Sequence, residues 1–172
     1  MKNIVKLVAA VAILTMCSNL SAQNIKLAHI NLDELIMSMP ESDSLNVKIQ
    51  KIGKELEEEL DALRVEYNKK LQDYVENRDK LTDLVRGTRE QDLNQMNQRM
   101  QLFQENAQEQ YQVEYNKLLQ PILEKANKAI ETVAKEQGIT YVMSANPQVL
   151  LFKAVGTLDL LPAVKQHLGI DK

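Results

Sequence analysis

Residues 45–74 read LNVKIQKIGKELEEELDALRVEYNKKLQDY, and this stretch decides the fold. Its apolar positions recur three or four residues apart, at Leu45, Ile49, Ile52, Leu56, Leu60, Leu63, Tyr67, Leu71 and Tyr74. That spacing is helical, because a strand would alternate every second residue. The 3-4-4 spacing is an 11-residue repeat, about 3.67 residues per turn, which predicts a nearly straight or slightly right-handed helix. Leu81 and Val85 continue the stripe after Arg78 interrupts it.

A second helical stripe follows and ends before Gly138. Gly87 fits the end of the first helix, and Thr88 with Gln91 fits a capping box at the start of the second. We therefore expect a tight turn at residues 86–89, and two antiparallel arms of about 65–75 Å. Pro121 should kink or restart the second arm. The second stripe consists of Leu93, Met96, Met100, Phe103, Ala107, Tyr111, Tyr115, Leu118, Ile122, Ala126, Ile130 and Val133.

Strand-like segments lie on both sides of this hairpin. They cover residues 25–30, 139–143 and 149–152, with a turn at residues 146–147 between the last two. A hairpin alone has too narrow a seam to bury a wide core, so we expect these strands to form a small sheet at its root. Such a sheet has open edges, which oligomerisation would close.

Short helices complete this expected body. One covers residues 32–37, and Asp159 would cap another that runs to Leu168 with Pro162 in its first turn. The predicted fold is mainly α with a small β body, from which a long antiparallel helical hairpin projects. We divide it into residues 23–44 and 138–172 for the body and 45–137 for the hairpin, all within a single domain.

Residues 1–22 have the pattern of a secretory signal peptide. Two lysines precede an apolar run over residues 7–16, and small and polar residues then predict cleavage after Ala22. The run is too short to span a bilayer, which takes roughly 20 residues. A lipoprotein acylated at Cys17 remains an alternative, which mass spectrometry of the mature N-terminus would reveal.

Charge and composition argue against several functional classes. Removal of the signal peptide would leave 19 basic and 24 acidic residues, a net charge of −5, whereas nucleic-acid binders are normally basic. The two histidines have no nucleophile or metal partner in sequence, and there is no glycine-rich phosphate loop. We therefore predict no catalytic residue, metal site or cofactor, and no enzymatic activity.

Several segments, in order, resemble the Skp/OmpH family of periplasmic chaperones. Besides the export signal, they are AHIN at 28–31, MPE at 39–41, FQENAQ at 103–108, QPI at 120–122 leading into AI at 129–130 and VA at 133–134, GITYV at 138–142, VLL at 149–151, and the last helix with Asp159. The resemblance covers residues 24–172. It implies a homotrimer whose three hairpins surround a cavity, where unfolded outer-membrane proteins are held in the periplasm without ATP. The well-known members are basic, and this chain departs from them by being acidic.

Candidate contact residues lie on the second half of the hairpin. Met96, Met100 and Phe103, with Tyr74 on the first arm, offer the adaptable apolar contacts that suit varied clients, although the same spacing is also that of a packed seam. Around them, residues 91–116 include 12 Gln or Asn among 26 residues.

A second set of candidates is basic and lies toward the hairpin tip: Arg78, Lys80, Arg86, Arg89 and Arg99. These side chains suit transient contact with an anionic membrane surface or an acidic client segment. The alternative is that they form ion pairs with neighbouring acidic residues along the helices. At the level of function, the alternative to a chaperone is a structural or adaptor coiled-coil protein of the cell envelope, which would have a fixed partner and would not suppress aggregation.

Overall fold

The computed structural model describes residues 25–146 and 150–170. The predicted signal peptide and the acylation alternative at Cys17 lie outside the described residues, as does Pro147 of the predicted turn. The elements, in chain order, are β1 (Leu27–Ile30), α2 (Leu32–Ser38), α3 (Pro40–Asn77), the 3-10 helix η2 (Arg78–Lys80), α4 (Asp83–Glu136), β2 (Tyr141–Ser144), β3 (Leu158–Asp159) and α5 (Leu161–His167).

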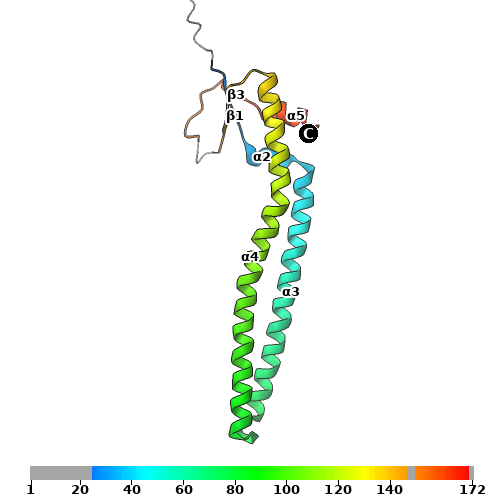
Figure 1. The fold of residues 1–172 in the computed structure, drawn as a ribbon, viewed down its shortest axis with the longest axis vertical. Coiled ribbons are helices and arrows are strands. Elements are labelled where there is room, and N and C mark those ends of the chain that lie inside the picture. Colours follow the sequence, from blue (N-terminus) through cyan, green and yellow to red (C-terminus); the bar gives the residue numbers. More distant parts are fainter. Residues whose placement is uncertain (1–24, 147–149, 171–172) are drawn as a thin grey trace, which may run out of the picture.

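The expected helical hairpin is present and dominates the molecule. Figure 1 shows α3 and α4 side by side, from the small body down to a turn at the far end. With 38 and 54 residues, they are about 57 and 81 Å long. The first arm begins earlier than the apolar stripe, at Pro40, whose ring suits the first helical position because its φ is already helical.

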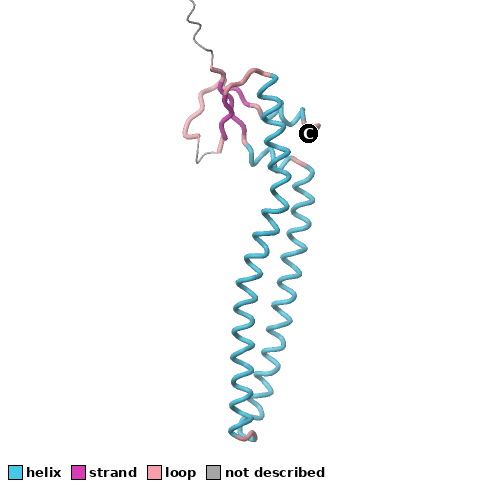
Figure 2. The backbone as a smooth tube through the Cα atoms, in the orientation of Figure 1, coloured by secondary structure: helices cyan, strands magenta, loops and turns pink. Residues whose placement is uncertain are grey.

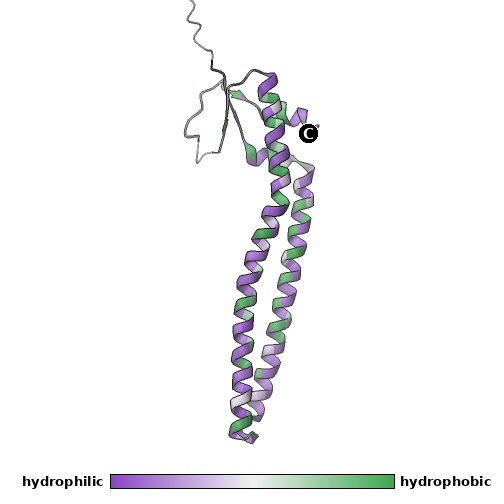
Figure 3. Cartoon of the chain, in the orientation of Figure 1, coloured by the Kyte–Doolittle hydropathy of each residue, from purple (hydrophilic) through white to green (hydrophobic). Residues whose placement is uncertain are grey.

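The two predicted stripes form the seam between the arms. Leu63, Tyr74, Leu93 and Met96 are buried along it, and the other stripe positions outside the body are half-buried except Val85, which is 40% exposed. Figure 3 shows hydrophobic bands recurring along both arms between hydrophilic turns. The two apolar stripes therefore keep one face of each helix against the other, as their helical spacing predicted.

The turn of the hairpin is not where we predicted it. The first arm ends at Asn77, η2 follows, and α4 begins at Asp83, so Gly87 and Thr88 lie inside a helix. Thr82 is the N-cap, and its hydroxyl accepts a hydrogen bond from the Val85 amide. The expected capping box is therefore wrong, and the interruption of the first stripe at Arg78 was the better signal.

In the second arm, Pro121 does not restart the helix as we expected, whereas the helix ends at Gly138 as predicted. The helix continues through Pro121, which has not restarted it, although the arm curves gently in Figure 1. Gly138 ends α4 as predicted, with a φ of 64° that favours glycine. Its amide donates to the Lys135 carbonyl and the Ile139 amide to the Ala134 carbonyl, the paired bonds of a Schellman motif.

The sheet has three strands in the order β2-β1-β3, and both pairs are parallel. Figure 2 shows it at the end of the hairpin away from the turn. The expected strand over residues 149–152 is wrong for 150–152, which lie outside any strand. Leu158 and Asp159 pair with β1 instead, while Leu151 and Phe152 are 92% and 81% exposed. Their apolar character indicated a strand, but within the part of the chain that the structure describes no strand pairs with them.

The core of the body lies where α2, α5 and the sheet meet the root of the hairpin. Leu35, Met39, Leu160 and Val164 are fully buried there, and α4 contributes Ala126, Ala129 and Val133, whose small side chains allow close approach. The expected short helix near residues 32–37 is confirmed as α2. Asp159 accepts a hydrogen bond from the Leu161 amide at 2.9 Å, so it supports the start of α5 from just outside the helix.

Candidate functional site

At the tip of the hairpin, the predicted contact residue Tyr74 is held inside the structure. It is 9% exposed, and its hydroxyl donates a hydrogen bond to the Glu90 carboxylate across the seam. The pKa of the Arg78 guanidinium is raised above its usual value. The largest cause is its hydrogen bond to Tyr74, and smaller causes are electrostatic attraction to Tyr74, Glu90 and Asp79. Tyr74, Arg78 and Glu90 thus form a small polar cluster that ties the two arms together beside the turn.

The other tip cations are mostly paired as well. Arg86 pairs with Asp83, Arg89 lies 3.5 Å from Asp73, and Arg99 lies 3.7 Å from Glu66. Lys80 is exposed, and among the described residues it has no ion-pair or hydrogen-bond partner. The structure therefore brings these cations together with carboxylates, and the tip presents much less positive charge than five basic residues would alone.

The apolar candidates on the second arm lie in the seam. Met96 is buried, whereas Met100 and Phe103 are half-buried. They follow one another at helical spacing and pack toward α3, so that only their outer edges reach solvent.

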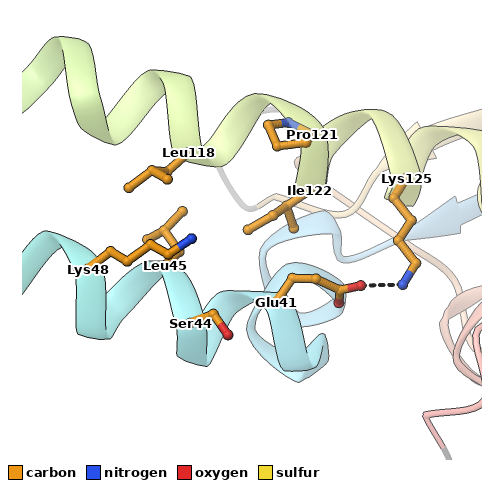
Figure 4. A pocket seen from close by; sticks show the side chains of 8 residues that line it. All are labelled: Glu41, Ser44, Leu45, Lys48, Leu118, Pro121, Ile122 and Lys125. Carbon is orange, nitrogen blue, oxygen red and sulfur yellow. Dashed lines mark hydrogen bonds and ion pairs between the residues drawn. The ribbon is translucent and has the colours of Figure 1, made fainter.

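One side of the seam carries the ion pairs that join the two arms. Besides the two arginine pairs with Glu66 and Asp73, Lys125 of α4 pairs with Glu41 at the start of α3 (Figure 4). The hydrogen bond from Lys125 is the largest of the effects that lower the pKa of Glu41. A groove of about 350 Å³ lies beside this pair, between Lys48 and Pro121. We call this flank the ion-paired side.

The opposite side of the seam is different near the root. A groove of about 520 Å³ opens there between α2, α3 and α4. Met37, 77% exposed, lies at its rim with Ile36, and Tyr115 and Leu119 line it from α4. Asp33, Ser42, Leu45 and Asn46 complete the lining. We call it the root groove, and the sequence stripes did not predict it because six of its eight lining residues come from α2 and the start of α3.

The sheet also leaves apolar side chains uncovered. Four apolar side chains of the strands are more than 40% exposed: Leu27, Tyr141, Met143 and Leu158. The loop between β2 and β3 exposes Leu151, Phe152 and Val155 even more. Parallel sheets are normally covered on both faces, so this exposure is unusual. By register, Leu27, Tyr141 and Met143 share one face of the sheet, and the sequence predicted open edges but not this exposure.

The buried histidine of the body, His29, links neighbouring parts of the sheet. His29 is 6% exposed in β1, with its Nε2 atom 3.3 Å from Lys153 Nζ and 3.8 Å from Asp159 Oδ2. These contacts join β1 to β3 and to the loop before it. Across residues 25–146 and 150–170, no three His, Cys, Asp or Glu side chains cluster as metal ligands would. Within the same residues, no helix combines the length and apolar character needed to cross a membrane.

Comparison with known proteins places these features in a family context. Residues 26–168 match the family model described as outer membrane protein (OmpH-like). The fold is similar to the crystal structure of a candidate outer membrane chaperone, also OmpH-like, from Caulobacter crescentus. That similarity has a TM-score of 0.70 at 14% identity, and it covers 86% of this chain and 84% of the other. No curated protein matches the sequence significantly.

Proposed function

The chain belongs to the OmpH-like family of outer membrane proteins, and from this premise we propose that it is an ATP-independent periplasmic holdase chaperone. It would bind unfolded outer-membrane proteins and keep them from aggregating during transit. The observation that carries the proposal is the hairpin itself. Two arms of about 57 and 81 Å enclose no wide core of their own, and so present a large surface for contact with another chain.

We propose further that three copies of the chain assemble through the sheet. The exposed Leu27, Tyr141 and Met143, together with the loop residues Leu151 and Phe152, form an apolar surface that water would not favour. A second and third copy would cover it and pair the open edges of β2 and β3. Three hairpins would then project from one shared body around a common space.

Client contact in this proposal uses many weak interactions along the arms. Met100 and Phe103 offer their half-buried edges, while Met96 and Tyr74 become available where the seam opens. Lys80 would be the tip cation that touches an anionic membrane surface, because within residues 25–146 and 150–170 it has no ion-pair partner, whereas the arginines face carboxylates. No step needs a nucleotide, a metal or a catalytic group.

The experiment that tests the proposal dilutes a urea-unfolded outer-membrane barrel into buffer with a molar excess of the mature protein. Light scattering by the client then follows aggregation. We expect scattering to fall with increasing protein in the absence of ATP. Unchanged scattering would contradict the holdase proposal and favour a structural or adaptor role.

Assembly and processing have tests of their own. Mass from light scattering on a sizing column should correspond to three chains, and a clean monomer would refute the trimer. Mass spectrometry of the protein recovered from the periplasm should give an N-terminus at Gln23, whereas an N-terminus at an acylated Cys17 would support the lipoprotein alternative.

A further inference from the structure

The two sides of the hairpin seam differ in chemistry along most of their length. The ion pairs that join α3 and α4, from Arg89–Asp73 near the tip to Lys125–Glu41 at the root, all lie on the ion-paired side. The pocket linings agree with this placement, since Met96 and Arg99 line one hollow with Lys70, and Lys125 lines another with Glu41. This side is held together by charge, and its side chains are already engaged.

On the opposite side, α4 carries a row of side-chain amides. One path of three- and four-residue steps back from Tyr115, which lines the root groove with Leu119, meets only Gln and Asn, although neighbouring steps reach Glu105 and Glu109. This amide row consists of Asn94, Asn97, Gln101, Gln104, Gln108 and Gln112. All six are exposed, and among the described contacts none is hydrogen-bonded to another side chain or to the main chain. The row leads from the tip half of α4 into the root groove, and the carboxylate of Glu105 lies beside it, four residues after Gln101 and three before Gln108.

We propose that the amide row and the root groove together bind one extended strand-length segment of an unfolded outer-membrane protein. This inference rests on the proposed holdase function and assigns it a particular surface. The row offers a donor and an acceptor at each amide, which is what an extended main chain lacks when it has left water but has not yet paired in a sheet. The root groove, with Met37 and Leu119, accepts an apolar side chain.

The length of the surface fits this occupant. From Asn94 to Leu119 the helix rises about 38 Å. An extended peptide covers that distance with about 11 or 12 residues. A membrane-spanning β-strand of an outer-membrane barrel has about 9–11 residues of alternating apolar and polar character. One such strand would therefore lie along the row with an apolar residue in the groove.

The charge pattern argues against other occupants. An anionic lipid surface or a nucleic acid would need cations, and the row has none. A fixed folded partner would need a cluster of aromatic or arginine anchors, which the row also lacks. On α3 the same side carries Arg64, which is already paired with Asp61. The six amides of the row carry no charge, and Glu105 is the carboxylate closest to them along the helix, so each contact with a client segment remains weak.

The test adds charge to one side of α4 at a time. The double variant Gln101→Glu/Gln108→Glu changes the amide row, and Gln95→Glu/Gln110→Glu is the matched control on the ion-paired side. Gln95 lies beside Arg99, and Gln110 is one 11-residue repeat beyond Arg99. Both variants add two carboxylates of nearly the same shape at exposed helix positions, so circular dichroism should show the same helix content. Binding of a dye-labelled unfolded barrel protein is then measured by fluorescence anisotropy.

We expect the row variant to bind about fivefold more weakly and the control to change by less than about twofold. Binding by the unsubstituted chain should also change little between about 50 and 500 mM salt, because screening acts on charges. Equal weakening of both variants, or a steep salt dependence, would overturn the inference while leaving holdase activity intact. A changed assembly mass of the row variant would show that the row contacts a second copy, and would overturn it too. An unsubstituted chain that binds no client would refute the proposed function itself.

Discussion

The position of the hairpin turn can be tested by whether one substitution raises or lowers the free energy of unfolding. Gly87 lies in the second turn of α4, and a Cβ atom built there has no neighbour within 4 Å, so Gly87→Ala meets no steric cost. Glycine in an exposed helix interior is less favourable than alanine by about 0.8–1.0 kcal/mol. We therefore expect Gly87→Ala to raise the free energy of unfolding by about 0.8 kcal/mol.

The measurement is urea unfolding followed by circular dichroism, at equal chain concentration because assembly affects apparent stability. With a slope of about 2 kcal/mol per molar urea, the midpoint should rise by about 0.4 M. The matched control is Gly138→Ala. Gly138 also has open space around it, but its φ of 64° is unfavourable for alanine, so that variant should lose about 1 kcal/mol.

A rise or a fall of the urea midpoint in Gly87→Ala distinguishes a turn at residues 78–82 from a turn at residues 86–89. If the chain turned at residues 86–89, Gly87 would take the left-handed conformation of a helix C-cap, and alanine would destabilise it as at Gly138. A midpoint that falls in Gly87→Ala would therefore refute the turn at residues 78–82 and restore the one expected from the capping pattern.

Three further predictions concern the tip, the body and the acid side of the pH range. Thr82→Ala should lower the free energy of unfolding by about 0.5–1 kcal/mol in the same urea assay, because it removes the N-cap of α4, and an unchanged midpoint would argue against that cap. Leu35→Ala should cost about 3 kcal/mol because Leu35 is fully buried, whereas Met37→Ala on the same helix should change stability by less than about 0.5 kcal/mol; equal effects would contradict the packing of α2. The folded-state pKa of Glu41 lies below its usual 4.5, so its pair with Lys125 stabilises the fold above that pH and this contribution is lost as the pH falls through the lowered pKa. In Lys125→Gln, an NMR titration should show that pKa moving back up, and an unchanged value would contradict the pair.

Regular parts of the fold could be predicted from sequence because their signal is local and repeated. The seam stripes, the helix α2 and the stop at Gly138 each depend on a few residues with one strong preference. The turn was harder, because Gly87 and Thr88 imitate a cap that helix packing overrides. The interruption at Arg78 carried the correct information, and it was visible in the stripe.

The C-terminal strand and the candidate surfaces depend on contacts between distant segments. Leu158 pairs with β1 across 130 residues, and nothing near it in sequence announces that partner. The root groove likewise combines Met37 with Leu119. The number of Gln and Asn residues was evident from the sequence. That six of them lie on one side of the seam became clear only once the ion pairs between α3 and α4 had identified the other side.

The order of the strands has a consequence for how the chain is made. β1 is the central strand, yet both of its neighbours come from beyond the hairpin, with Leu27 opposite Tyr141 and Ala28 opposite Leu158. The arms can fold as soon as residues 40–136 are present, because they pack chiefly against each other, whereas the sheet must wait for β3 at residues 158–159. A chain cut short anywhere before residue 158 leaves β1 with an unpaired edge. The three-stranded sheet can therefore form only after the chain has been synthesised through Asp159.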